Sequence, residues 1–141
     1  MLKVMAFIRR RANISREEFR RHYETGHAPM IRNIAPLILG YRRNYYQPQF
    51  DALIHGFHGF HGPPTGGEPY DAVTEVWLAD EAALQAMYRT LRADAARVHD
   101  DEDRFLDKAS LRVIVVEEVV TDLESMQSRT GRSEHGISAE G

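Results

Sequence analysis

The sequence predicts one α+β domain in which strands and helices follow the order βαββαβ. Three observations support this prediction. Four short runs are rich in the β-branched and aromatic residues typical of strands, two stretches repeat apolar residues at helical spacing, and 141 residues suffice for one core but not for two. A hydrophobic content of 43% and a charged content of 28% are typical of soluble globular proteins, which excludes wholesale disorder and fibrous structure.

The start of the chain predicts a strand followed by a helix. Residues 2–8 form a short apolar run, which indicates a strand buried on both faces. Ser15 and Glu18 have the spacing of a capping box, in which each side chain accepts a hydrogen bond from the other residue's backbone N–H. A helix is therefore predicted to begin at about Arg16.

This first helix is predicted to pack through one face and to change direction near its end. Phe19 and Tyr23 lie four residues apart, and His27 continues the same stripe. Gly26 and Pro29 both disfavour a continuous helix, so we expect His27 to lie at a helix junction where its ring faces a cavity.

The rest of the chain predicts three more strands and a second helix. Residues 36–46, 70–78 and 111–120 are rich in strand-forming residues, and the middle run places two acids and a tryptophan on one face. Asp80 is a predicted N-cap. The apolar positions of the helix that follows are Leu84, Met87, Tyr88 and Leu91.

This order is that of the ferredoxin-like fold, with both helices on one face of the sheet. The strands are apolar on their other face too, so we expect that face to pack against a second subunit in a homodimer. We assign residues 1–122 to the domain, and we expect residues 123–141 to be a disordered tail because they are poor in apolar side chains.

A glycine-rich segment at 47–69 carries histidines at every third position, His55, His58 and His61. Zinc and iron sites usually place histidines four apart on a helix or at alternate positions on a strand, and this spacing fits neither pattern. We therefore interpret the segment as a mobile lid whose Phe57 and Phe60 close over an apolar ligand, with a metal site as the alternative.

Composition restricts the remaining function classes. The absence of cysteine excludes disulfides, thiolate metal sites and cysteine nucleophiles. A net charge of −3 gives no basic field for nucleic acid, and no apolar run reaches the length of a membrane span. We expect a cytoplasmic protein that binds neither nucleic acid nor membranes.

Four segments resemble the EthD family in order and spacing, namely SREEFRRHYETGHAPMIR, GYRRNY, YDAVTEVWLADEAAL and DEDRFLDKASLRVIVVEE. The resemblance covers about residues 2–120, apart from the histidine-containing segment, and implies a dimeric α+β barrel. The founding member of this family accompanies a bacterial cytochrome monooxygenase system that degrades ether fuels. Fungal relatives are dehydratases or decarboxylases in aromatic polyketide pathways, and a more distant relative with the same fold resembles cofactor-free isomerases. The family's recurring positions correspond to His27, Pro29, Tyr41, Asn44, Asp71, Glu75, Trp77, Asp101 and Phe105.

We predict three catalytic residues. His27 titrates near neutral pH, as acid–base work requires, although it is alternatively a helix-junction cap. Glu75 is expected to have a raised pKa beside Trp77, or else to pair with Arg42 or Arg43. Tyr41 is expected to orient a substrate oxygen, or else to be a core residue.

The predicted substrate-binding residues come from several elements. Asp71 is predicted to bind substrate, or else to have a structural role at a turn or strand edge. Asp101 is expected to cap a short turn before Phe105. The arginines at 9–11 either hold a substrate carboxylate or form a solvated strand end. The substrate-binding set comprises Trp77, Asn44, Asp71, Tyr23, Phe57 and Phe60.

Taken together, the sequence predicts a cofactor-free enzyme of the dehydratase, isomerase or decarboxylase type. It would transfer protons on a small apolar cyclic or aromatic metabolite. Two alternatives stay open: a non-catalytic ligand-binding protein that supports an oxygenase, and a haem-dependent oxidoreductase.

Overall fold

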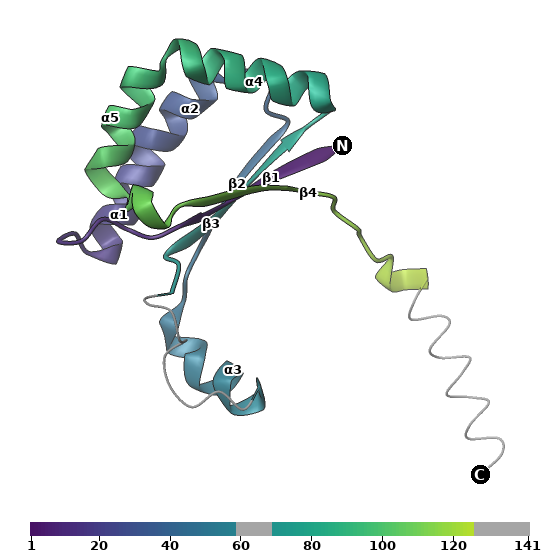
Figure 1. Cartoon of the computed structure of the whole chain (residues 1–141). Helices are drawn as coiled ribbons and strands as arrows, with labels where there is room; N and C mark the ends of the chain where they lie inside the picture. The colour runs from purple at the N-terminus through teal and green to yellow at the C-terminus, as the bar shows by residue number, and fades with distance from the viewer. Residues whose placement is uncertain (59–68, 126–141) are drawn as a thin grey trace.

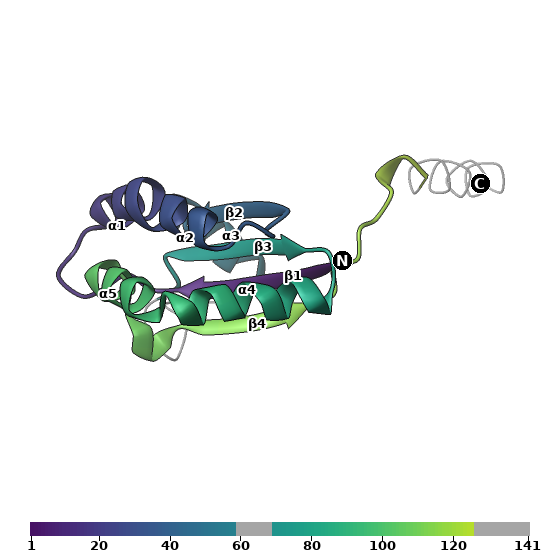
Figure 2. The ribbon, with the colours of Figure 1, turned by 90° about the horizontal axis from the view of Figure 1, so that it is seen from above.

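The computed structural model describes residues 1–58 and 69–125, and within them a four-stranded antiparallel sheet is covered by helices on one face (Figure 1, Figure 2). The strand order is β2-β3-β1-β4. This arrangement confirms the predicted ferredoxin-like α+β fold. The strands are β1 (Leu2–Ile8), β2 (Gly40–Tyr45), β3 (Ala72–Leu78) and β4 (Arg112–Val116).

The helices fall into three groups. The first is one helical run that contains α1 (Arg16–His22), a π-helical turn (Tyr23–His27) and α2 (Ala28–Ile34). The second group, α4 (Glu81–Ala93) and α5 (Ala95–Phe105), lies beside it over the same face of the sheet (Figure 2). The third is α3 (Asp51–His58), which extends away from the sheet on the side opposite the other helices (Figure 1). Short 3-10 turns lie at Pro48–Phe50 and Lys108–Ser110.

Both predicted helix starts are confirmed by their caps. The N–H of Glu18 donates to Ser15 Oγ at 3.0 Å, and the N–H of Ser15 donates to Glu18 Oε2 at 3.3 Å. At the second helix the N–H of Ala83 donates to Asp80 Oδ1 at 2.9 Å. These side chains satisfy N–H groups that the first turn of a helix leaves unpaired, and so they fix where each helix begins.

The core lies between the sheet and the helices, because side chains alternate between the two faces of each strand. Phe19, Phe105 and Leu78 are the largest fully buried side chains. They come from α1, α5 and β3, so the core connects both groups of covering helices to the sheet.

Two helices were not predicted. The charged residues before Phe105 belong to α5, whose apolar stripe includes Val98 and Phe105, and the short turn expected there is absent. α3 lies within the segment interpreted as a lid loop, where Leu53, Ile54 and Phe57 have helical spacing but are all exposed. A helix is predicted from apolar residues that recur every three or four positions. The many charged residues of α5, and the glycine and histidines of α3, made this recurrence hard to recognise.

Asp71 connects the ends of two strands to the first helix. Its carboxylate is 6% exposed and accepts hydrogen bonds from the N–H of Arg10 at 2.8 Å, from Arg10 Nη1 at 2.7 Å and from Arg16 Nε at 3.3 Å. Its backbone N–H donates to the carbonyl of Ile8. These hydrogen bonds favour a structural role for Asp71 at the strand edge, which was the predicted alternative to substrate binding.

No helix in the described ranges, 1–58 and 69–125, has the length and apolar character needed to cross a lipid bilayer.

We expect the substitution Asp71→Asn to lower the free energy of unfolding by about 2 kcal/mol, because an amide offers one acceptor oxygen to two arginines and leaves a buried donor unpaired. Urea denaturation monitored by circular dichroism measures this change. Glu17→Gln, on the exposed side of α1, is the control and should leave the midpoint unchanged. Equal midpoints for Asp71→Asn and wild type would contradict the structural role.

Candidate active site

His27 lies where a π-helical turn joins α1 to α2, so the predicted helix junction is present. The hydrogen bonds of a π-helix span five residues, and the N–H of Ala28 donates to the carbonyl of Tyr23 accordingly. Pro29 follows and has no N–H to donate into the preceding turn, which favours this wider geometry. The result is a histidine on the buried side of the helix, only 8% exposed.

Asp101 of α5 receives hydrogen bonds from two histidines of this helical run. His27 Nδ1 lies 2.8 Å from Asp101 Oδ2, and His22 Nε2 lies 3.0 Å from Asp101 Oδ1. An ionised carboxylate can only accept, so both nitrogens that face it carry hydrogens. In the neutral His27 ring this leaves Nε2 as the basic nitrogen.

Gly26 makes room for the second histidine. A Cβ atom at residue 26 would lie 3.2 Å from Cε1 of the His22 ring, closer than most such contacts in proteins. Gly26 therefore leaves space for the His22 ring, and Pro29 favours the π-helical turn that positions His27.

Aromatic rings surround this cluster. Phe105 is fully buried, and its ring centroid lies 4.9 Å from that of His22, 5.0 Å from that of His27 and 5.3 Å from that of Tyr23. Tyr23 also meets His27 edge-on at 5.5 Å. Burial lowers the pKa of His27 from its ordinary 6.5, and the hydrogen bond to Asp101 opposes this change. The neutral, basic form of His27 is therefore favoured at neutral pH.

A chain of hydroxyl groups connects the π-helical turn, at Tyr23, to the sheet. The Tyr23 hydroxyl lies 2.6 Å from Thr74 Oγ1 of β3 and hydrogen bonds with Tyr41 of β2. Burial raises the pKa of both tyrosines, so both phenols stay protonated and can donate hydrogen bonds. Of the predicted residues, the structure thus brings His27, Tyr23 and Tyr41 together.

A partly buried ion pair fixes the position of β2 against the π-helical turn. Arg43 Nε and Nη2 lie 2.8 and 2.7 Å from the two carboxylate oxygens of Glu24, and the Tyr45 hydroxyl donates to the same carboxylate. The bond from Arg43 lowers the pKa of Glu24 to about 2. Because Tyr41 and Arg43 are on the same face of β2, this pair also orients Tyr41.

Comparison with known proteins places this geometry in a family. A family model described as the EthD domain matches residues 11–109, more than half of the chain. The chain belongs to the EthD family. No curated protein sequence matches this EthD-family protein.

Solved structures share its fold at low sequence identity. An EthD-family protein from Bacillus halodurans is 21% identical with a TM-score of 0.56, and the match covers 84% of this chain and 99% of that protein. An EthD-like protein from Ralstonia eutropha is 14% identical with a TM-score of 0.56, covering 86% and 94%. A dimeric ferredoxin-like protein of unknown function from Thermobifida fusca is 13% identical with a TM-score of 0.50, covering 83% and 90%. Identities this low establish a shared fold and nothing further.

The structure places three predicted residues of this EthD-family protein on the opposite face of the sheet from His27. Thr74 of β3 bonds to Tyr23 beneath the helices, so its neighbour Glu75, and Trp77 beyond it, point the other way. Asn44, paired with Val73, lies on that same open face and donates to Glu75 Oε2 at 3.1 Å. One site cannot contain both Glu75 and His27 within a single subunit.

The environment of Glu75 also differs from the prediction. A salt bridge from Lys3 lowers its pKa, so Glu75 is ionised at neutral pH and is not the protonated acid that was expected. The predicted alternative partners were Arg42 and Arg43, whereas Lys3 is the ion-pair partner. The Trp77 ring lies between Lys3 and Arg42, at 4.7 and 4.9 Å from its centroid.

The histidine-containing segment is only partly described. Phe57, His55 and His58 are on α3, and Phe57 is 85% exposed. Phe60 and His61 lie outside the described residues. Within the described ranges, no three His, Asp or Glu side chains are grouped as metal ligands.

His22 was missed, and Asp101 was assigned the wrong role. Residues five apart do not share a face of an α-helix, so no pattern in the sequence indicates that His22 and His27 converge. The prediction that Asp101 caps a turn was wrong, because Asp101 is inside α5 and bonds to both histidines. The Val98 to Phe105 spacing was the available signal for that helix.

We expect the pKa of His27, measured by NMR, to lie below 6.5 and to fall further in Asp101→Asn, because the carboxylate that opposes the burial effect is then removed. His99→Gln, on the exposed side of α5, is the control variant and should leave the His27 pKa unchanged. An unchanged His27 titration would contradict the assigned hydrogen bond.

The same pKa makes stability depend on pH. Folded His27 binds a proton more weakly than unfolded His27, so its contribution to the free energy of unfolding is complete above pH 6.5 and is lost as the pH falls through its folded pKa. We expect His27→Gln to flatten this part of the profile, and His99→Gln to leave it unchanged. Urea denaturation at a series of pH values provides the measurement.

Proposed function

We propose that this EthD-family protein is a cofactor-free enzyme that transfers protons on a small apolar metabolite, cyclic or aromatic. The observation that carries the proposal is the His27–Asp101 pair, buried among aromatic rings with phenol donors beside it. A histidine whose Nδ1 is held by a carboxylate is oriented to use its other nitrogen as a base.

The proposed reaction begins with proton abstraction. His27 Nε2 accepts a proton from carbon next to a substrate carbonyl, and Asp101 stabilises the imidazolium that forms. Tyr41 or Tyr23 donates a hydrogen bond to the carbonyl oxygen, where negative charge develops. The imidazolium then returns the proton to another carbon in an isomerisation, or to a departing hydroxyl group in a dehydration.

A cavity of about 350 Å³ approaches this hydroxyl chain and supports the small size of the substrate. It lies where α2 ends and β2 begins, and Tyr41 contributes to its wall. His27 does not line it, so the substrate is expected to enter beside Tyr41 and to reach His27 through a rearrangement of the α2 end. The lining residues are Arg32, Asn33, Ala35, Pro36, Ile38, Leu39, Gly40 and Tyr41.

Exchange of carbon-bound hydrogen for deuterium tests this proposal without knowledge of the natural substrate. We expect the protein to accelerate exchange next to the carbonyl of a small cyclic ketone such as 1-tetralone in D₂O, followed by NMR. His27→Gln should slow the exchange by at least about a hundredfold, the usual contribution of a general base. His99→Gln is the matched control and should keep the wild-type rate.

Two outcomes would contradict the catalytic proposal. If a panel of cyclic ketones, lactones and phenols binds but none exchanges faster than in buffer, the protein is a ligand-binding protein. If His27→Gln exchanges as fast as wild type, the base is another residue.

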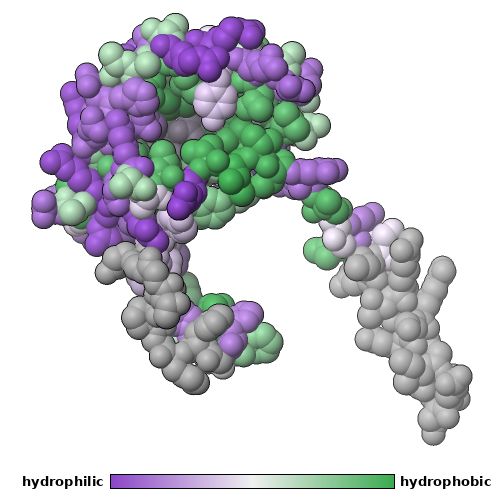
Figure 3. Space-filling model, viewed as in Figure 1, coloured by the Kyte–Doolittle hydropathy of each residue, from purple (hydrophilic) through white to green (hydrophobic). Residues whose placement is uncertain are grey.

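We also infer that the open face of the sheet packs against a second copy of the chain. Helices cover only the other face (Figure 2), and the open face carries apolar side chains that include Met5, Phe7, Val73 and Ile114. Ile114 of β4 is about half exposed on this open face, and the surface along β4 at the edge of the sheet is hydrophobic (Figure 3). The related protein from Thermobifida fusca is described as dimeric.

Ile114→Asp should weaken this dimer, because it places a charge on the apolar open face. We expect sedimentation velocity to show a dimer for the wild type and a larger monomer fraction for Ile114→Asp at equal concentration. Ala82→Asp, exposed on α4, is the control and should stay dimeric. A monomeric wild-type protein would contradict the inference.

A further inference from the structure

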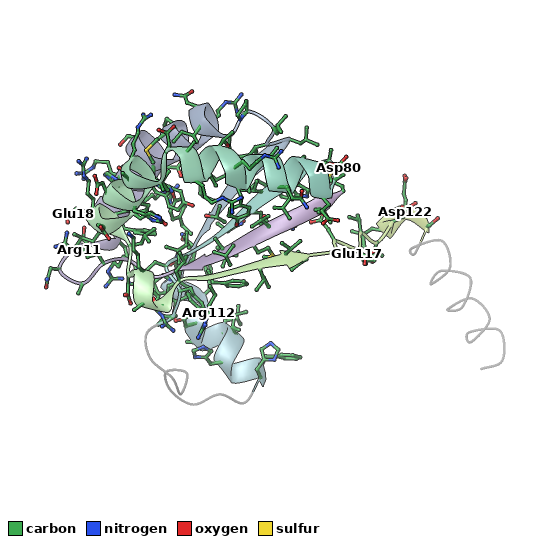
Figure 4. All side chains as sticks on the ribbon, turned by 45° about the horizontal axis from the view of Figure 1, so that its top comes forward. Arg11, Glu18, Asp80, Arg112, Glu117 and Asp122 are labelled. Atoms are coloured by element: carbon green, nitrogen blue, oxygen red, sulfur yellow. The ribbon has the colours of Figure 1, made fainter. Side chains whose placement is uncertain are left out.

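A second cavity, of about 730 Å³ and open to solvent, lies at the end of the domain where β1 leads into α1. Its walls are the 9–14 loop, Asp71 and the region that follows α5. Arg11 extends from this loop at the opposite end of the molecule from Glu117 (Figure 4). His27 and Tyr41 do not line this cavity, so it is distinct from the candidate active site.

The loop that forms the cavity is held in a fixed shape. The N–H of Arg11 donates to the carbonyl of Phe105 at 2.8 Å, and Arg10 forms a β-bridge with Leu106. Asn13 has a φ of 77°, the left-handed conformation that asparagine tolerates better than most residues. The walls therefore need little rearrangement to receive a ligand.

Two of the four cations that line the cavity are already paired with carboxylates. Arg10 binds Asp71 at 2.7 Å, and Lys108 binds Asp103 at 2.9 Å. Arg11 has only the carbonyl oxygen of Asp103, at 3.4 Å from Nη1. Among the described residues, Arg9 and Arg11 thus lack a carboxylate partner.

Arg9 has the more unusual environment. Its guanidinium lies over the Tyr70 ring, 4.7 Å from the centroid, which limits its movement. Its Nε is buried and has no hydrogen-bond partner in the described part of the chain. A buried donor without an acceptor is costly, so a ligand oxygen at this position would remove a penalty as well as add a bond.

The charges in the wall indicate the kind of ligand. The four cations of the wall are accompanied by three carboxylates, those of Asp71, Asp103 and Asp107. The net charge of the lining residues is therefore only slightly positive, which disfavours binding of a polyanion. Guanidinium groups match the two oxygens of a planar carboxylate. We propose that this cavity binds the carboxylate of a small organic acid through Arg9 and Arg11, independently of the proposed reaction at His27.

Benzoate, titrated calorimetrically at low ionic strength, is the probe. We expect the wild-type protein to bind it, and Arg9→Gln and Arg11→Gln each to weaken binding at least about tenfold, the effect of losing one charge-assisted hydrogen bond. Arg21→Gln, on the exposed side of α1, is the matched control and should bind as wild type. His27→Gln should also bind as wild type, which separates this site from the candidate active site.

Several results would overturn the proposal. Wild-type protein that does not bind benzoate at millimolar concentration has no carboxylate site here, and equal affinity of wild type and Arg11→Gln would place benzoate elsewhere. Tighter binding of inorganic phosphate than of benzoate would reject the carboxylate assignment. Because Arg11 is exposed, its substitution tests the site even if Arg9→Gln fails to fold.

Discussion

The architecture depends on a sheet that is covered by helices on one face only. Period-two alternation along each strand then separates neighbouring side chains into two environments. Thr74 meets Tyr23 beneath the helices, whereas Glu75, the next residue, binds Lys3 on the open face. The polar residues of this chain therefore include two separate groups within one subunit: a histidine and phenol cluster under the helices, and a charged cluster on the face inferred to meet a second copy.

The helical side gathers a histidine pair, a carboxylate and a phenol around the buried ring of Phe105, which contacts His22, Tyr23 and His27. The π-helical turn supplies His27 and Tyr23, α5 supplies Asp101 and Phe105 itself, and the sheet supplies Thr74. Aromatic packing excludes water from the pair while hydrogen bonds set the direction of each ring. A buried imidazole next to a carboxylate is a costly arrangement for stability alone, which supports a chemical role.

Much of the fold followed from the sequence, because local signals were strong there. The capping box at Ser15 and the N-cap at Asp80 located both predicted helices, and Gly26 with Pro29 located the junction at His27. The site was harder to predict. Its histidines converge only through a π-helical turn, and Asp101 comes from a helix hidden in a charged stretch, so neither contact left a periodic signal. Glu75 and His27 appeared compatible because one-dimensional patterns do not show which face of the sheet a helix covers.

The π-helical turn has a consequence for how this family can vary. Each residue of an α-helix advances about 100° around the axis, and a π-helical turn contains one residue more than the α-helical turn it replaces. Removal of one residue between His22 and His27 would return the segment to a regular α-helix with the two histidines four residues apart, a spacing at which side chains share one face. The spacing of the two histidines and the helix type are therefore linked: histidines five residues apart need the π-helical turn to reach one carboxylate, whereas histidines four residues apart would reach it from a regular α-helix.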